Sequence, residues 1–373
     1  MSTKLKYGLI GCGGFGRFCL QQYGRMPNVE CIAVADNREE LALAVAREFK
    51  LEACASPEAL LERTDIDLVH LATPPFTHAS LAIAALEAGK HVLCEKPLAL
   101  TEADASDMIS LAHDKGLILA VNLIMRYNPL CLMVKNLVGS KLLGLPLHAS
   151  LMNAAQDETL FPDHWFWDPT KSGGIFIEHG VHFFDLFEWW FGPGKVQAAQ
   201  QLFRPGTERI EQVQCALRYG DTTLATFYHG FHQMLRRDQQ QWRIVFETGT
   251  LTMTEWVPTR LLLDATLSEV DLQAICELCP GGEVTIQQHY APEESHPTSR
   301  DQLRTAEIHA SILWGAGYEK MDLYGQMLRD LLDDQIAAIR DKSHFRRVSE
   351  TNGLSSLLTA ILAQQAADAA LLS

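Results

Sequence analysis

A glycine-rich turn near the start of the chain constrains the fold more than any other feature. The run G-C-G-G-F-G at residues 11–16 follows an apolar stretch at residues 5–10 and precedes a helical pattern. Gly11 permits a tight turn, Gly13 lets a pyrophosphate approach the backbone, and Gly16 allows close helix packing. The helix N-terminus then faces the phosphates. The sequence therefore predicts a dinucleotide-binding βαβ unit, the alternative being a glycine-rich turn without a ligand.

Asp36 supports the dinucleotide interpretation. It ends the second predicted strand, 20 residues after Gly16, where a carboxylate can accept hydrogen bonds from the ribose hydroxyls. A carboxylate at this place repels a 2′-phosphate, which favours NAD over NADP. Arg38 could bind such a phosphate, so NADP stays an alternative.

Short apolar runs alternate with helical patterns through the first third of the chain. The predicted strands cover residues 5–10, 29–35, 51–54, 67–72, 90–94 and 117–121. The predicted helices cover residues 15–26, 39–49, 57–63, 78–88 and 102–115. Six strands joined by crossover helices predict an α/β fold with a doubly wound parallel sheet, a Rossmann domain at residues 1–122.

The pattern changes after Asn122. A helix is expected up to residue 138, and strand-like runs follow at 147–153, 196–203, 213–219, 223–231, 242–247 and 250–254. Residues 265–315 are expected to hold some strand and some mobile loop, and helices are expected at 321–341 and 350–371. We expect an α+β domain at residues 123–350 with a large, mostly antiparallel open sheet, followed by a C-terminal helix at 351–373.

Charge and cysteine content exclude several classes of protein. Lys and Arg number 31 against 46 Asp and Glu, so the net charge is −15, which gives nucleic acids and anionic membranes little reason to bind. No apolar run reaches the ~20 residues that span a bilayer. Nine scattered cysteines, Cys276 and Cys279 among them, indicate free thiols in a reducing compartment. With no leader-like segment before the first strand, we expect a cytoplasmic protein.

Two short motifs follow predicted strands, the place where ligands bind in open α/β sheets. They are Thr73-Pro74-Pro75 and Glu95-Lys96-Pro97. Lys96 could donate a charged hydrogen bond to a substrate oxygen, or act as an acid or base. Alternatively, it is a surface lysine paired with Glu95.

A third motif, between residues 172 and 185, opens with two glycines and continues with carboxylates and histidines. On a helix, Glu178, His182 and Asp185 share one face. A histidine beside a carboxylate can relay protons. A metal site would need a fourth ligand, and none is evident, so we expect no metal. A polar stripe on an aromatic helix is the other alternative.

The segment 163–171 precedes this motif and mixes aromatic with polar residues. Trp165 could stack on a sugar ring while His164 and Lys171 bind its hydroxyl groups. A packed loop is the alternative.

Together these motifs resemble one family, the glucose-fructose oxidoreductase, inositol dehydrogenase and MocA family (Gfo/Idh/MocA) of nicotinamide-dependent sugar and polyol oxidoreductases. The resemblance also includes His78 after the Ala-Thr-Pro-Pro run, the Arg126-Tyr-Asn-Pro segment, and residues 348–353 at the entry to the last helix. It leaves residues 265–315 unplaced.

The resemblance implies a Rossmann domain, a second domain whose open sheet builds a homodimer or homotetramer, and an active site between the domains. Lys96 matches the family's catalytic lysine, and the following Pro97 commonly closes a cis peptide. His182 matches the acid/base histidine. Glu178 stands at the family's aspartate position, where it would orient His182.

We therefore predict an NAD-dependent dehydrogenase that oxidises a secondary alcohol of a sugar, polyol or derivative, with catalytic residues Lys96, His182 and Glu178. The expected cofactor contacts are Gly11, Gly13, Gly14, Phe15, Gly16, Asp36, Asn37, Thr73, Pro74, Pro75, His78, Glu95 and Lys96. The expected substrate contacts are Arg126, His164, Trp165, Lys171 and Asp185. Two alternatives stay open: a non-catalytic dinucleotide-binding sensor, and a redox-neutral lyase or hydrolase that holds NAD tightly.

Overall fold

The computed structural model describes residues 4–372, which divide into two compact units. The first unit contains residues up to 126 together with 162–185 and 324–361. The second contains residues 127–161, 186–323 and those from 362 on. Two later segments, 162–185 and 324–361, therefore belong with the N-terminal part of the chain. The units alternate along the sequence, whereas the prediction divided the chain once at residue 122 and again at residue 350.

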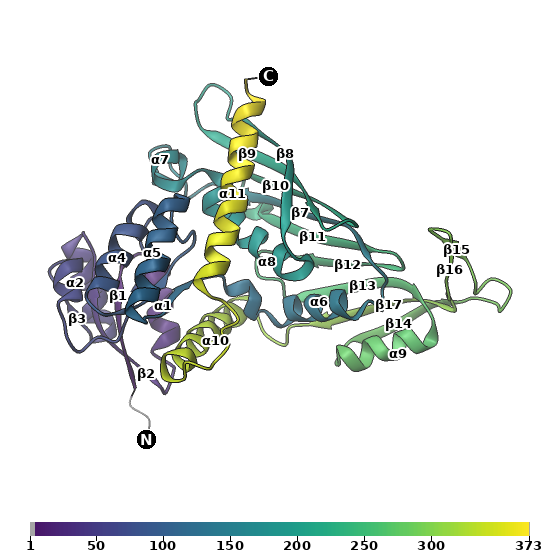
Figure 1. Cartoon of the computed structure of the whole chain (residues 1–373), viewed down its shortest axis with the longest axis horizontal. Helices are drawn as coiled ribbons and strands as arrows, with labels where there is room; N and C mark the ends of the chain where they lie inside the picture. Colours follow the sequence, from purple (N-terminus) through teal and green to yellow (C-terminus); the bar gives the residue numbers. More distant parts are fainter. Residues whose placement is uncertain (1–3, 373) are drawn as a thin grey trace. The chain divides into compact units, whose positions relative to one another are not determined.

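The first unit contains a six-stranded parallel sheet in the order β3-β2-β1-β4-β5-β6. The strands are β1 Leu5–Ile10, β2 Val29–Ala35, β3 Glu52–Ala53, β4 Leu68–Leu71, β5 His91–Cys94 and β6 Leu119–Val121. This is the strand order of a dinucleotide-binding doubly wound sheet, with the order reversing between β1 and β4. The predicted Rossmann domain is confirmed (Figure 1).

Five helices connect these strands. They are α1 Gly14–Tyr23, α2 Glu39–Phe49, α3 Pro57–Leu61, α4 His78–Glu87 and α5 Glu102–Lys115. Helix α5 has the bounds expected from the sequence because both ends are capped. The Thr101 side chain accepts from the backbone N–H of Asp104, and Gly116 takes the left-handed conformation that ends the helix.

The second unit contains a nine-stranded sheet in the order β14-β17-β13-β12-β11-β7-β10-β9-β8. The strands are β7 Pro146–Gln156, β8 Gly194–Phe203, β9 Ile210–Tyr219, β10 Thr223–Gln233, β11 Gln239–Phe246, β12 Gly249–Thr254, β13 Arg260–Leu267, β14 Glu283–His289 and β17 Ile308–Gly315. All neighbours are antiparallel except β7 and β10. The prediction of a large, mostly antiparallel sheet is confirmed.

Side chains on this sheet alternate between buried and more exposed along β10, β11 and β13, as expected when one face carries the core. On the buried face, the ring of Phe187 lies 4.6 Å from that of Phe227 and 6.4 Å from that of Trp242. Phe187 comes from α8, Val181–Phe191. An aromatic cluster thus joins the end of this helix to the middle of the sheet.

The remaining helices are α6 Pro129–Ser140, α7 Pro169–Ser172, α9 Glu269–Leu278, α10 Lys320–Arg340 and α11 Glu350–Ala370. Most of α10 belongs to the first unit, where Asn28 donates to Asp333 and the Tyr324 ring lies 5.3 Å from that of Phe18. The two predicted C-terminal helices are confirmed within one residue at each end.

The expectation for residues 265–315 was wrong in one respect. Helix α9 lies where only strand and loop were expected; Ser268 caps it by accepting from the backbone N–H of Asp271. The Ser-x-x-Asp pattern was the available signal. A short hairpin of β15 Thr298–Ser299 and β16 Gln302–Leu303 follows β14 and projects away from it and from β17 (Figure 1).

All nine cysteines are free, and six of them are buried. In the part of the chain that the structure describes, no helix has the length and hydropathy needed to cross a membrane.

Candidate active site

The glycine-rich turn has the shape of a phosphate cradle. Gly11 has φ +102°, and a Cβ there would collide with the carbonyl of Ala72. A Cβ on Gly16 would collide with the carbonyl of Gly11, so both positions need glycine for backbone reasons. By contrast, a Cβ on Gly13 or Gly14 would meet nothing within 4 Å. The open space beside these two residues, at the N-terminus of α1, fits a bound pyrophosphate.

Asp36 is tied to this turn. Its carboxylate accepts from the backbone N–H of Cys12 at 2.8 Å and from that of Arg38 at 2.9 Å, and the residue is 8% exposed. The Arg38 side chain contacts the same carboxylate at 3.4 Å and is 69% exposed, and Asn37 is exposed beside it. The end of β2 and the glycine turn are therefore held together by the acidic residue predicted to bind ribose.

Phe15 faces another part of the same unit. Its ring lies 6.1 Å from that of Tyr324 in α10. This contact packs the start of α1 against α10.

The loops after β4 and β5 are joined by His78. This residue is buried, with Nε2 2.9 Å from the carbonyl of Thr73 and Nδ1 2.7 Å from the carbonyl of Pro97. Burial lowers the pKa of His78, against the opposing influence of the two carbonyls. Pro75 opens the short turn before α4, and the Lys96-Pro97 peptide is cis. The predicted residues of the two loops thus lie close together at the carboxyl ends of neighbouring strands.

Lys96 contacts Glu178. Its Nζ donates to Glu178 Oε1 at 2.5 Å and to the Glu178 backbone carbonyl at 2.9 Å. The two side chains are 17% and 13% exposed, so the pair is partly shielded from water and its attraction exceeds that of a surface pair. Glu95, the partner considered in the sequence analysis, bonds elsewhere, so that alternative for Lys96 is wrong.

Glu178 lies on a π-helical turn rather than on the α-helix expected from the sequence. The turn spans Phe176–Gly180 and passes directly into α8. Gly173 and Gly174 before it take positive φ angles of 79° and 88°, which glycine adopts without strain. Such π-turns are frequent at functional sites. Here the turn lets both the carboxylate and the carbonyl of Glu178 reach Lys96.

Two histidines follow on this segment. His182, on the first turn of α8, is 6% exposed. The His179 ring lies 6.3 Å from the His182 ring, with its Nε2 buried. Burial, together with the charge of Lys96, lowers the pKa of His179 to about 3. His179 is therefore neutral at physiological pH and adds no charge beside Lys96.

Arg126 and Asp185 bind each other. Arg126 Nε and Nη2 donate to the two carboxylate oxygens of Asp185 at 2.9 and 2.7 Å. The side chains are only 8% and 2% exposed, and Arg126 also donates to the backbone carbonyl of Arg347 at 3.3 Å. The bidentate pair ties the segment before α6 to α8, so two residues predicted to bind substrate are brought together as a buried ion pair.

The aromatic segment before α7 forms a folded turn. His164 Nδ1 accepts from the backbone N–H of Phe166 at 3.2 Å, and the His164 and Trp165 rings lie 5.1 Å apart. Lys171 is exposed and pairs with Asp168 at 3.1 Å. The segment belongs to the same unit as Lys96 and His182, which keeps His164 and Trp165 as candidates for substrate contact.

A buried polar network escaped the sequence analysis. His70 on β4 contacts Tyr7 on β1 and Glu95 after β5. Within residues 4–372 one group of potential metal ligands comes together, Cys19 with His70 and Glu95, and their ligand atoms lie within 4.8 Å of one another. The signal in the sequence was a lone histidine inside the apolar run of β4, but only the folded sheet supplies its partners.

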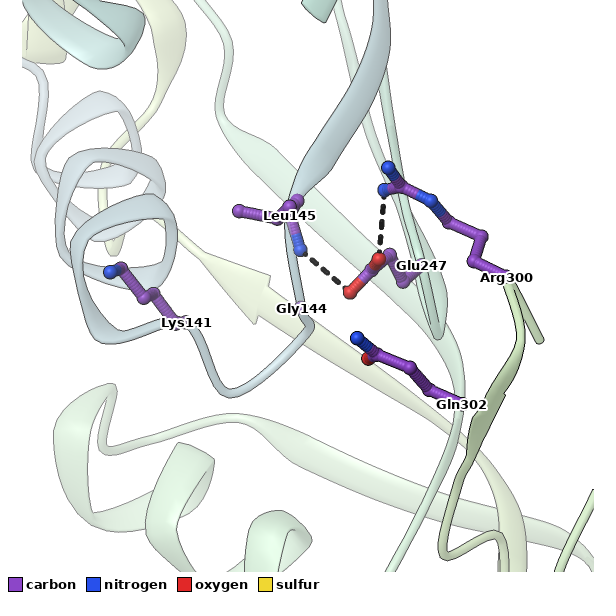
Figure 2. Close-up of a pocket in the computed structure, with 6 residues that line it drawn as sticks. All are labelled: Lys141, Gly144, Leu145, Glu247, Arg300 and Gln302. Atoms are coloured by element: carbon purple, nitrogen blue, oxygen red, sulfur yellow. Dashed lines mark hydrogen bonds and ion pairs between the residues drawn. The ribbon is translucent and has the colours of Figure 1, made fainter. Parts of the chain in front are cut away.

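A cavity of about 310 Å³ lies in the second unit, apart from every predicted residue. Figure 2 shows Glu247 at its wall, between the backbone of Leu145 and the side chain of Arg300. Glu247 accepts from the Leu145 N–H at 3.1 Å and pairs with Arg300 at 2.9 Å and Arg304 at 3.0 Å. These bonds fasten the β15–β16 hairpin to the end of β11, so we assign the buried carboxylate a structural role.

Comparison with known proteins finds two matching family models and several relatives. Residues 5–123 match a family model described as "Oxidoreductase family, NAD-binding Rossmann fold", and residues 131–252 match "GFO/IDH/MocA C-terminal domain". The chain is 38% identical over 252 residues to a dTDP-3,4-didehydro-2,6-dideoxy-α-D-glucose 3-reductase of Streptomyces violaceoruber, covering 67% of this chain and 72% of that protein.

Two further proteins are similar. A 1,5-anhydro-D-fructose reductase of Ensifer adhaerens is 28% identical over 234 residues, or 61% of this chain and 69% of that protein. Among solved structures, the WlbA dehydrogenase from Bordetella pertussis in complex with NADH and UDP-GlcNAcA has a TM-score of 0.79 at 20% identity. That match covers 99% of this chain and 97% of the other, and it supports the fold.

Proposed function

The chain belongs to the GFO/IDH/MocA family of NAD-binding oxidoreductases, and we propose that it interconverts a secondary alcohol of a sugar, polyol or derivative with the corresponding ketone. The observation that carries this proposal is the Lys96–Glu178 pair, which the fold places on the same unit as the glycine-rich turn and the buried His182. A lysine held in this way at the end of a sheet strand can bind an oxygen atom that gains negative charge during the reaction.

NAD fits the first unit. The open space beside Gly13 and Gly14 would hold the pyrophosphate, and Asp36 would accept the ribose hydroxyls. The loops joined by His78 would hold the nicotinamide half at the carboxyl ends of β4 and β5. When bound, the nicotinamide supplies the acceptor or donor of the hydride. Backbone hydrogen bonds hold the Asp36 carboxylate where it would repel a 2′-phosphate. We therefore expect NAD to bind more tightly than NADP.

Side chains of this protein would accept the hydroxyl proton and stabilise the negative charge that develops on the substrate oxygen. In the oxidation direction, His182 takes the proton of the substrate hydroxyl, and the Lys96 ammonium donates to the same oxygen. Glu178 was expected to orient His182, but its carboxylate holds Lys96. We therefore assign Glu178 to positioning the lysine and keeping its three protons directed.

Similarity suggests a substrate class. The relatives above include reductases of a dTDP-linked didehydro sugar and of an anhydro-ketohexose, so a pyranose-type ring with an oxidisable hydroxyl is the substrate we propose. Trp165 and His164 offer an apolar face and a polar edge for such a ring. Arg126 and Asp185 act mainly by holding α8, since their polar atoms face each other; Lys171 stays a candidate contact.

We also propose that the protein is a cytoplasmic homodimer or homotetramer. The more exposed face of the nine-stranded sheet carries Leu224, Leu262 and Leu313, which are 58%, 41% and 37% exposed. Leu262 and Leu313 are cross-strand neighbours. A second copy of the chain would bury this apolar surface, and the nine free thiols suit a reducing compartment.

The test is absorbance at the reduced-nicotinamide band while purified protein receives NAD or NADP and a panel of sugars, polyols, sugar acids and nucleotide sugars. We expect turnover with NAD that Lys96→Ala lowers at least about 100-fold, because the charge on the substrate oxygen loses its donor. Lys115→Ala, an exposed lysine at the end of α5, is the matched control and should keep full activity.

Equal activity of the wild type and Lys96→Ala would overturn the assignment of Lys96. Absence of turnover across the panel would reject the dehydrogenase. NAD retained through purification would then favour the redox-neutral enzyme, and NAD binding without any reaction would favour the sensor.

A further inference from the structure

A chain of buried polar groups lies directly before Lys96. Tyr7 Oη is 2.7 Å from His70 Nδ1, and His70 Nε2 is 2.9 Å from Glu95 Oε1. Asn122 Nδ2 donates to the same Glu95 oxygen at 2.7 Å. Tyr7 and His70 are 0% exposed and Asn122 is 2% exposed. This series of hydrogen-bonded side chains therefore crosses the first unit from β1 through β4 to the ends of β5 and β6.

The geometry fixes the donors to Glu95. A carboxylate only accepts hydrogen bonds, so His70 Nε2 carries the proton that binds Glu95. Nδ1 lies 2.7 Å from the Tyr7 hydroxyl, and burial raises the pKa of Tyr7 well above its usual value, so this hydroxyl keeps its proton. Each member thus orients the next, ending at Glu95.

Cys19, His70 and Glu95 are residue types that can bind a metal. Their contacts favour hydrogen bonding instead. Both ring nitrogens of His70 are already bonded, to Tyr7 and to Glu95. Burial raises the pKa of the Cys19 thiol well above its usual value, and metals bind the thiolate. The group is therefore a hydrogen-bond network around one carboxylate.

The carboxylate it holds is the residue before Lys96. The Glu95 backbone N–H donates to the Leu71 carbonyl at 3.0 Å, and on the other side of Lys96 the Pro97 carbonyl is bonded to His78. Lys96 therefore lies between two anchored residues. A misplacement of about 1 Å can slow a reaction about 100-fold. Anchors on both sides of Lys96 would therefore help to preserve the rate.

We propose that His70 is a positioning residue for Lys96, acting through Glu95, and that Tyr7 and Asn122 complete the support. This inference rests on the proposed function for its effect on catalysis. The anchoring itself is a property of the protein without substrate and can be measured without it.

The experiment compares His70→Phe, which removes the donor to Glu95, with His70→Gln, whose amide can donate from nearly the same place. His91→Gln is the matched control, since His91 stands at the opposite end of β5 and its Nδ1 accepts from the Ile118 N–H. For each variant we would measure kcat, the KM for NAD, and hydrogen exchange of a peptide covering residues 94–99 by mass spectrometry.

We expect His70→Phe to lower kcat by about 10- to 100-fold with a KM for NAD within about threefold of wild type. Exchange at residues 94–99 should become about tenfold faster because the anchor at Glu95 is lost. His70→Gln should recover most of both effects, and His91→Gln should change neither. A purely structural role would predict loss of stability with equal damage from Phe and Gln, and no particular effect at residues 94–99.

A double-mutant cycle of His70→Ala with Glu95→Gln tests the route of action, and the small alanine side chain guards against a His70→Phe variant that fails to fold. If His70 acts through Glu95, the double variant His70→Ala/Glu95→Gln should be no slower than Glu95→Gln alone. Additive losses would overturn the proposal. If the wild type has no turnover at all, the proposed function fails, and the exchange data alone decide whether His70 anchors the Lys96 segment; unchanged exchange would reject that anchoring.

Discussion

At the residue scale, the partners of charged groups determine what they can do. Lys96 and Glu178 form one partly shielded pair, and Arg126 and Asp185 form a second, more deeply buried one. The first pair leaves the Lys96 ammonium partly accessible, as the proposed function requires. The second pair is bidentate and almost fully buried, where removing one partner would strand a charge, so its contribution is mainly to structure.

The buried His179 makes the stability of the folded protein depend on pH. Its pKa is about 3 in the folded protein, against about 6.5 in an unfolded chain. Below pH 6.5 the unfolded chain binds a proton that the folded protein does not. The contribution of His179 to stability is thus complete above pH 6.5 and is lost as the pH falls toward 3, with a slope of up to about 1.4 kcal/mol per pH unit.

Urea unfolding at pH 7, 6, 5 and 4 checks this expectation. The His179→Gln variant should lose less free energy of unfolding than the wild type over this range, because it lacks the titrating ring. His113→Gln, on the exposed surface of α5, should follow the wild type. Parallel curves for wild type and His179→Gln would contradict the assignment.

At the element scale, local signals succeeded where they fix a helix end or a tight turn. The bounds of α2 and α5 agree with the prediction, since α5 has a threonine cap and a glycine stop and α2 ends at a left-handed Lys50. The π-helical turn at Phe176–Gly180 was not predicted. Its Glu178 contacts Lys96, 82 residues away in sequence, and no local pattern indicates that contact.

The turn before α1 supports a prediction about glycine. Gly16→Ala places a Cβ against the carbonyl of Gly11, so α1 must shift away from β1. We expect a loss of about 1–3 kcal/mol in the free energy of unfolding, as for overpacked sites, and weaker NADH binding measured by nucleotide fluorescence.

Gly14→Ala is the control for stability. A Cβ there meets nothing within 4 Å of protein, so the unfolding free energy should stay within about 0.5 kcal/mol of wild type. Equal stability of the Gly16→Ala and wild-type proteins would contradict this prediction. It would mean that the new Cβ and the Gly11 carbonyl move apart with little loss of free energy.

At the scale of the whole molecule, each unit has its own sheet and its own core, and the chain passes between them several times. Segment 162–185, which carries Glu178 and His182, belongs with the glycine-rich turn although more than 140 residues separate them in sequence. In the oligomer proposed above, copies of the chain associate through the open sheet of the second unit.

Light scattering after size exclusion tests that association. We expect the wild type at two or four times the chain mass of 41.6 kDa, and Leu262→Glu at a lower mass, because a charge would be buried beside Leu313. Leu43→Glu, at a 43% exposed position on α2, should keep the wild-type mass. A monomeric wild type, or equal masses for all three, would reject the sheet face as the interface.

The sequence by itself determined the Rossmann sheet and the large second sheet, and it indicated Lys96 and His182 as candidates for the proposed chemistry. Strand and helix periodicity, and the geometry that glycine allows, are local properties and can be seen in a linear chain. The partners of these residues are contacts between distant segments. Only the tertiary structure decided that Glu178 holds Lys96, that Arg126 binds Asp185, and that His70 meets Glu95, because each bond depends on which strands and helices lie side by side.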